Sequence, residues 1–191
     1  HGVRQVLVFH GVGISSFELE SGRELWDFPL VNMPKVNSAQ PVKFDDTSLL
    51  IGTGYGVGSV RMELTTGDDR WHVDEVWKTN RLKLKFNDVV LIDQFLYGLD
   101  DGVLTCIESS TGKTKWKARG FGYGQLLAFE HTLLVVTEEG DVVLVSAVPA
   151  RFHELARFHA LDGTTWNHPV VAQGKLLVRN GSMAACYDVA P

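Results

Sequence analysis

Short apolar runs alternate with turn residues along this chain, and they predict β-strands. The runs that precede a turn glycine are Val6–Phe9, Leu49–Ile51, Phe95–Leu99, Leu133–Val136 and Leu176–Val178. Those that follow one include Val103–Ile107, Val142–Val145 and Met183–Tyr187. Runs of this length, rich in β-branched and aromatic residues, predict strand–turn–strand units. The Asp-Gly pair at 101–102 suits a tight turn, because glycine tolerates a positive φ.

Three tryptophans add a longer period to this pattern. Trp26, Trp71 and Trp116 follow one another at intervals of 45 residues. Each ends a nine-residue motif that opens with glutamate and has glycine four positions before the tryptophan: Glu18–Trp26 with Gly22, Glu63–Trp71 with Gly67, and Glu108–Trp116 with Gly112. One short β-rich unit per period is typical of a repeat architecture.

We interpret each unit as four strands. In the second repeat they are predicted at Gln40–Phe44, Ser48–Thr53, Ser59–Leu64 and Asp69–Val73, with the Thr-Gly pair forming the turn before the fourth. The tryptophan then begins the outer strand, where its ring can bury about 150–250 Å² against the next sheet. Stacking on a ligand is the alternative, but one ring in every repeat favours packing.

The later repeats depart from the motif. In the fourth, Ala147 takes the acidic position and Leu155 replaces tryptophan, and we expect 151–158 to form an outer strand although it resembles a helical turn. The fifth ends at Asp188. The units are predicted at about 1–30, 31–76, 77–119, 120–160 and 161–191 of a single domain. The first lacks an innermost strand and the last an outermost one, so we expect the chain to be the C-terminal part of a longer protein.

Composition excludes some classes of function. The formal net charge is −5, whereas general nucleic-acid or anionic-membrane binders need a basic surface. No apolar run approaches the roughly 20 residues of a transmembrane helix. The two cysteines, Cys106 and Cys186, lie at equivalent positions of separate repeats, where we expect buried small hydrophobic residues and no disulfide.

The nine-residue motif, in which an acidic residue is followed by glycine and then tryptophan, resembles the tryptophan-docking motif of the pyrroloquinoline-quinone-like (PQQ-like) β-propellers. The strongest local matches are Tyr97–Trp116 and Trp166–Asp188, while glutamate replaces the usual aspartate at 18, 63 and 108. The resemblance implies an all-β fold, a β-propeller segment of four-stranded antiparallel blades from a ring of seven or eight. It also implies a bacterial protein that is periplasmic or secreted. The superfamily includes quinoprotein alcohol dehydrogenases and the β-propeller lipoprotein of the outer-membrane assembly machinery.

The dehydrogenases of this superfamily carry a quinone, a calcium ion, a catalytic aspartate and adjacent cysteines. This chain has no adjacent cysteine pair, so we expect no cofactor, metal ligand or catalytic residue. A fragment of a PQQ-dependent alcohol or sugar dehydrogenase, with PQQ and calcium, is the alternative. The glycine-rich stretches 52–58 and 120–124 do not complete a nucleotide-binding motif, and His153-Glu154 does not complete a zinc motif. The acidic pairs at 45–46, 68–69, 100–101 and 138–139 are interpreted as solvated charges in turns.

Loop residues outside the repeat motif are the best candidates for a binding site. Aromatic and polar residues predicted to gather on one loop face are Trp77, Asn80, Tyr123, Trp166, His168, Arg179 and Asn180. Exposed aromatics with convergent polar groups favour binding, although Trp77 and Trp166 could equally cap the blades. The leading hypothesis is a non-catalytic scaffold in a bacterial envelope. Its partners would be a protein or a glycan, together with the remainder of its own propeller. An unpaired blade edge would also attract an added strand.

Overall fold

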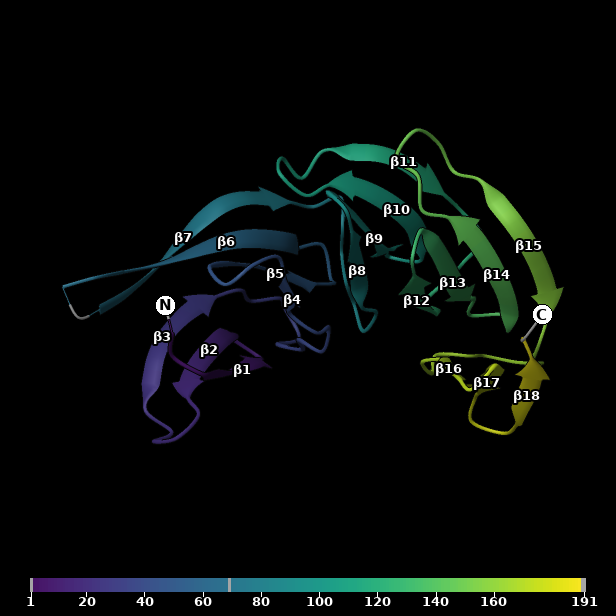
Figure 1. Cartoon of the computed structure of the whole chain (residues 1–191), viewed down its shortest axis with the longest axis horizontal. Coiled ribbons are helices and arrows are strands. Elements are labelled where there is room, and N and C mark those ends of the chain that lie inside the picture. Colours follow the sequence, from purple (N-terminus) through teal and green to yellow (C-terminus); the bar gives the residue numbers. More distant parts are fainter. Residues whose placement is uncertain (1, 69, 190–191) are drawn as a thin grey trace. The chain divides into compact units, whose positions relative to one another are not determined.

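The computed structural model describes residues 2–68 and 70–189, and these residues form eighteen β-strands and no α-helix. The predicted all-β class is therefore confirmed. The chain divides into two compact units, His1–Phe86 and Asn87–Pro191. In Figure 1 the strands of each unit are grouped in separate sheets. Whether residues 1–191 form a single partial propeller stays a prediction.

The first unit contains two antiparallel sheets. The three-stranded sheet has the order β1-β2-β3, with β1 at Gln5–His10, β2 at Gly13–Glu18 and β3 at Glu24–Pro29. The four-stranded sheet has the order β4-β5-β6-β7, with bounds Val42–Lys43, Ser48–Thr53, Gly58–Gly67 and Arg70–Thr79. The second strand of this repeat has the predicted bounds, the first is shorter, and the third and fourth are longer.

The second unit contains three antiparallel sheets. The first comprises β8 Val89–Ile92, β9 Phe95–Asp100, β10 Val103–Glu108 and β11 Thr114–Ala118. The second comprises β12 Gln125–Phe129, β13 Thr132–Val136, β14 Asp141–Ser146 and β15 Glu154–His159. The third comprises β16 Val170–Ala172, β17 Lys175–Arg179 and β18 Ala184–Asp188. The segment that resembled a helical turn is thus the outer strand β15, as predicted.

One backbone hydrogen bond recurs in all five sheets and fixes their equivalent positions. An N–H at or just after the end of the third strand, or inside the longer β6, donates to the carbonyl just before the second strand of the same repeat. The pairs are Leu19 to Arg4, Leu64 to Thr47, Ser109 to Gln94, Ala147 to His131 and Val189 to Gly174. The residues one position earlier are therefore equivalent. They are the predicted Glu18, Glu63, Glu108 and Asp188, but in the fourth repeat Ser146 holds the position that we assigned to Ala147.

The strand register also identifies the tryptophan position. In each complete outer hairpin a β-bulge follows one residue of the third strand, and we call its partner on the outer strand the bulge position. Trp26 occupies it opposite Ser16, and Trp116 occupies it opposite Cys106. In the fourth repeat the residue is Ala156, not the predicted Leu155. In the second repeat it is Trp77, opposite Arg61.

Trp71 therefore does not hold the position that its 45-residue spacing predicts. It pairs with Thr66, near the far end of the long hairpin formed by β6 and β7. Gly67 remains in β6 and pairs with Arg70, and Asp68 has a φ of 51°. The predicted Thr-Gly turn is wrong in this repeat, because the strands continue past it to a tighter turn.

In the first and third repeats the motif forms the predicted turn. Gly22 and Gly112 have φ values of 70° and 68°, a left-handed conformation that favours glycine. Their N–H groups donate to the carbonyls of Glu18 and Glu108, respectively. The side chain of Glu108 also accepts a hydrogen bond from the Thr111 hydroxyl at 2.6 Å. The acidic residue and the glycine thus define one turn together.

The tryptophans at the bulge position are core residues in two repeats. Trp26 is 5% exposed among Ile14, Leu49 and Met62 in the first unit. Trp116 is 8% exposed in the second unit, where its indole N–H donates at 2.8 Å to the Val148 carbonyl in the β14–β15 loop. These two rings serve packing and are not exposed platforms for a ligand.

The two cysteines differ in environment. Cys106 is buried and free, and burial raises the pKa of its thiol to about 11, so it is a protonated core residue as predicted. Cys186 is free but exposed, contrary to the prediction. It pairs with Leu177 in the last sheet, on the face opposite Leu176 and Val178, which pack into the core of the second unit.

Candidate functional site

Three loops of the second unit meet at Glu138, in the turn between β13 and β14. The Glu138 N–H donates to the Phe121 carbonyl in the β11–β12 loop at 2.9 Å, and its carbonyl accepts from the Thr165 N–H in the β15–β16 loop at 2.8 Å. Its carboxylate accepts from the Tyr123 N–H at 3.2 Å and from the Trp166 indole N–H at 2.8 Å. Two of the predicted site residues, Tyr123 and Trp166, are thus brought together. We call Tyr123, Glu138 and Trp166 the loop cluster.

The glycine-rich stretch that precedes Tyr123 makes this meeting possible. Gly122 has a φ of 60°, and a Cβ built on it would lie 2.5 Å from both the Cβ and Oε2 of Glu138. A side chain there would displace the carboxylate. The stretch 120–124 therefore serves the close approach of two loops, in agreement with its interpretation as loop glycines.

Trp166 is held in place yet remains available at the surface. Trp166 is 51% exposed, and the Glu138 carboxylate accepts a hydrogen bond from its indole N–H. Its carbonyl accepts a hydrogen bond at 3.1 Å from Gln125, which is 2% exposed. An exposed aromatic side chain whose orientation is already fixed loses little conformational entropy when a partner binds it.

Asn180 forms hydrogen bonds within the chain that hold two connecting segments together. Its amide group donates to the Asp162 carbonyl at 2.8 Å, and its side-chain oxygen accepts from the N–H groups of Ser182 and Met183, both at 3.0 Å. The residue is 7% exposed. It therefore connects the β15–β16 loop with the β17–β18 turn.

His168 and Arg179 line a separate cavity of about 310 Å³ on the last sheet, together with Val170, Leu177 and Cys186. His168 also lies 3.5 Å from the Asp88 carboxylate. The predicted residues of the second unit thus divide between the loop cluster, this cavity and Asn180.

The other two predicted residues lie in the first unit. Trp77 is in β7 at the bulge position, and not in a loop as predicted, while Asn80 is exposed just after this strand. Trp77 therefore belongs to a strand, and its predicted role in binding stays a prediction.

Sequence reasoning missed Glu138, which was interpreted as a solvated turn charge together with Glu139. Only Glu139 is exposed. The same interpretation is wrong for Asp100, which is 5% exposed and pairs with Lys117. Asp45 is an exposed turn residue as interpreted, and its carboxylate also accepts hydrogen bonds from the Thr47 and Ser48 N–H groups, both at 2.7 Å. No local signal in the sequence identifies Glu138, because the loops that it contacts are distant from it in the chain.

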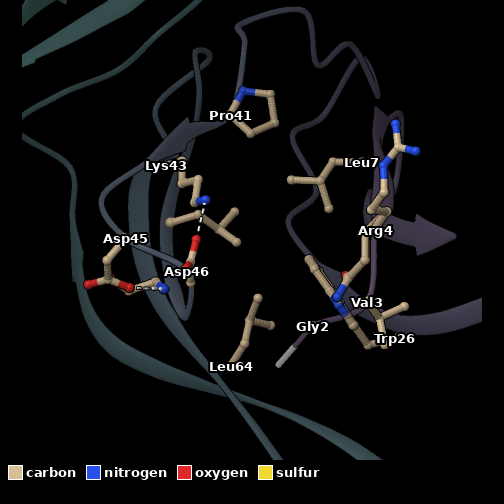
Figure 2. Close-up of a pocket in the computed structure, with 13 residues that line it drawn as sticks. Gly2, Val3, Arg4, Leu7, Trp26, Pro41, Lys43, Asp45, Asp46 and Leu64 are labelled. Atoms are coloured by element: carbon tan, nitrogen blue, oxygen red, sulfur yellow. Dashed lines mark hydrogen bonds and ion pairs between the residues drawn. The ribbon is translucent and has the colours of Figure 1, made fainter. Parts of the chain in front are cut away.

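The first unit contains a larger cavity of about 460 Å³. Figure 2 shows Leu7 and Trp26 of one sheet facing it, with Val3 of the segment before β1, and Lys43 and Leu64 facing it from the other sheet. The Lys43 ammonium pairs with Asp46 at 2.5 Å on its rim. The lining is thus apolar at its centre and carries both signs of charge at its edge.

Over 2–68 and 70–189, no three His, Cys, Asp or Glu side chains converge as a metal site would require. We therefore derive no step through PQQ or calcium, and the dehydrogenase alternative stays a prediction. In the same part of the chain, no helix has the length and apolar character needed to span a bilayer.

Comparison with known proteins places the fold. The profile of the family described as outer membrane protein assembly factor BamB matches residues 1–118. The crystal structure of BamB from Moraxella catarrhalis superposes with a TM-score of 0.68 at 19% identity, over 96% of this chain and 58% of that one. The computationally designed Ika8 protein superposes with a TM-score of 0.67 at 9% identity, over 99% of this chain and 56% of that one. The chain thus spans less than two thirds of either structure. No curated protein sequence matches it.

Proposed function

Because the chain belongs to the BamB family of PQQ-like β-propellers, we propose that it is a non-catalytic, protein-binding scaffold of the bacterial envelope. The family match over residues 1–118 is the observation that carries this proposal. The name of the matched family refers to outer-membrane protein assembly, so components of that machinery are the first partners to test. The proposal covers a part of such a protein, since the chain spans 58% of the BamB structure.

The loop cluster is the surface through which we propose that a protein partner binds. Trp166 offers a large exposed ring, and tryptophan is enriched among the residues that dominate binding energy at protein interfaces. Glu138 and Gln125 hold the indole and backbone of Trp166, which supports a preorganised contact. The nearby Tyr123 would extend the same contact, because its N–H is bound to the same carboxylate.

Site-specific photo-crosslinking in the envelope tests this proposal. A photoreactive amino acid at position 166 should capture a defined envelope protein. The same substitution at Phe129, which is 46% exposed in the same unit, should capture much less. Fractionation of the same cells should recover the protein with the envelope. A cytoplasmic location, or equal capture from both positions, would contradict the proposal.

Purified components then separate a protein partner from a glycan. Trp166→Ala should weaken binding of the captured protein by at least about tenfold, the scale expected when a central aromatic contact is lost. Gly122→Ala should weaken it as well, because the added methyl group displaces Glu138. Phe129→Ala is the matched control and should bind as the parent does. Binding to an envelope glycan with no affinity for any envelope protein would overturn the assignment of a protein partner.

A further inference from the structure

The connections at one end of the second unit carry an excess of negative charge. These connections are residues 101–102, 119–124, 137–140, 160–169 and 180–183. Their acidic residues are Asp101, Glu138, Glu139 and Asp162, and Arg119 is their basic residue of fixed charge. The connections at the other end, residues 93–94, 109–113, 130–131, 147–153 and 173–174, contain Asp93 and Glu130 balanced by Lys113 and Arg151. The negative charge therefore belongs to the end that carries the loop cluster.

Close contacts join the acidic connections on the N-terminal side of the loop cluster. A Cβ built on Gly102 would lie 3.1 Å from the Gly122 backbone, so the turn that contains Asp101 adjoins the β11–β12 loop. Glu138 bonds to the same loop through its N–H and to Thr165 through its carbonyl. The two acidic turns of the unit therefore lie on either side of one glycine-rich loop.

A second set of contacts holds Asp162 near Trp166. The Asn180 amide donates to the Asp162 carbonyl at 2.8 Å and to the Thr165 hydroxyl at 3.3 Å. The β15–β16 loop is thus folded back, and its carboxylate lies close to the residue that precedes Trp166. The exposed indole and the acidic residues consequently form one continuous group of loops.

Two of these carboxylates are accessible to a binding partner. Glu139 is exposed and forms no ion pair with any residue in the described part of the chain. The Asp162 side chain is 89% exposed and contacts the ring of His159, which is charged only when protonated. Exposed charges of one sign attract the opposite charge from a distance and raise the rate of association.

Trp166 adds a surface that suits a cation. Its indole is 51% exposed, and its N–H donates to the Glu138 carboxylate at 2.8 Å. A negative group on the indole N–H polarises the ring and makes its face more attractive to a cation. Tryptophan is the side chain that binds cations best in this way, and the planar guanidinium group of arginine stacks on such a face.

We propose that the protein partner presents an arginine-bearing segment to the loop cluster, with its guanidinium group stacked on Trp166 and paired with the Glu139 carboxylate; this rests on the proposed function. The charge of the surface favours this occupant over others. An acidic segment would be repelled by Glu139 and Asp162, and an uncharged glycan would gain nothing from either. Arginine can use the ring and a carboxylate at once, because its guanidinium group is both planar and charged.

Peptide binding to the ¹⁵N-labelled chain, followed at the indole N–H of Trp166, tests the chemistry of the partner. The probe is the peptide GGRGRGG, blocked at both ends, and its control contains citrulline, a neutral group of similar shape, in place of both arginines. The arginine peptide should shift the Trp166 signal in a saturable way. The citrulline peptide should bind at least about tenfold more weakly, because it has no charge for stacking or ion pairing. The buried indoles of Trp26 and Trp116 are internal controls that should not shift.

Two matched variants identify the carboxylate. Glu139→Gln should weaken binding of the arginine peptide about threefold, the scale of one exposed ion pair. Glu130→Gln removes an exposed glutamate from the other end of the unit and should bind as the parent does. Raising the ionic strength from about 0.05 to about 0.5 M should weaken binding to the parent more than binding to Glu139→Gln, because salt screens exposed charges. Equal binding of the two peptides, equal losses in the two variants, or no saturable shift at millimolar arginine peptide would overturn the proposal.

Photo-crosslinking at position 166 separates a failure here from a failure of the proposed function. Capture of a defined envelope protein that Glu139→Lys reduces and Glu130→Lys does not would support both. Capture that neither variant reduces would overturn the arginine-bearing partner and leave the proposed function standing. Arginine-selective peptide binding without capture of any envelope protein would overturn the proposed function, whereas the preference of the loop cluster for a guanidinium group would stand.

Discussion

The second and third repeats contain nearly the same motif and fold it differently. In the third, Gly112 adopts a left-handed conformation and Trp116 lies at the bulge position. In the second, Gly67 stays in β6 and Trp71 lies opposite Thr66, while Trp77 takes the bulge position. The comparison teaches that regular spacing identifies a repeat, whereas strand register decides which side chain enters its core.

The physical reason lies in the residues around each motif. In the second repeat, Thr65, Thr66 and Val73 are β-branched and favour continued strands. The turn then moves to Asp68, an aspartate that can adopt a positive φ. A second tryptophan six residues after Trp71 allows the longer hairpin to keep an indole at the bulge position. The third repeat has no such second tryptophan.

The largest predicted effect is the loss of a tryptophan from the bulge position. Trp116→Ala should lower the free energy of unfolding by about 3–5 kcal/mol, because it removes a buried ring and its hydrogen bond to the Val148 carbonyl. Trp71→Ala should cost clearly less, since Trp71 is only partly buried. Urea denaturation of both variants checks this prediction. Equal losses would break the comparison.

A pair of glycine substitutions should give the next largest effect. Gly22→Ala should cost about 1–2 kcal/mol, because alanine resists the left-handed φ of 70°. Gly67→Ala should be neutral or stabilise by up to about 1 kcal/mol, because Gly67 is in a strand with open space around its Cα. Thermal unfolding can rank the two. A greater loss at Gly67 would indicate that the second repeat forms the turn of the first.

A smaller effect is expected from the hydroxyl that closes the motif turn. Thr111→Val should lower the free energy of unfolding by about 0.5–1 kcal/mol, because it removes the exposed hydrogen bond from the Thr111 hydroxyl to the Glu108 carboxylate. Thr66→Val, at the equivalent position of the second repeat, should have a smaller effect, since valine suits a strand. Chemical denaturation of the two variants side by side measures the difference. Equal costs would remove this distinction between the repeats.

The smallest predicted effect is a pH dependence of stability in the fourth repeat, which lacks a tryptophan at the bulge position. Asp141 and then Asp162 raise the pKa of His159 through hydrogen bonds of 2.9 and 3.0 Å, and Arg157 also binds Asp141. Because the pKa of His159 is raised in the folded state, the protonated ring stabilises the fold. This stabilisation is fully present below the ordinary pKa of 6.5 and is lost as pH rises through the raised value. The free energy of unfolding of the parent protein should therefore fall slightly as pH rises through that window, whereas His159→Gln should not show this fall. Identical pH profiles would contradict this assignment.

Sequence reasoning predicted the repeated strands well because an apolar run between turn residues is a local signal. It identified the four-stranded unit, the outer strand at β15 and the equivalence of Glu18, Glu108 and Asp188. It failed where pairing between strands decides the outcome, as with Trp71, Ala147 and Leu155. Side-chain spacing along one strand contains little information about how far a hairpin extends.

The candidate site was predictable only in part for the same reason. The structure brings the predicted residues Tyr123 and Trp166 together, and their aromatic character in loops was visible in the sequence. Glu138 was missed because its role depends on two loops that are distant in the chain. The internal hydrogen bonds of Asn180 could not be predicted, since nothing local indicates that its side-chain amide contacts Asp162 and Met183.

The most direct test is the register of the second repeat, measured by nuclear Overhauser contacts between backbone protons of β6 and β7. The structure predicts strong cross-strand contacts between Thr66 and Trp71 and between Arg61 and Trp77. A contact between Arg61 and Trp71 would instead place Trp71 at the bulge position and contradict the account.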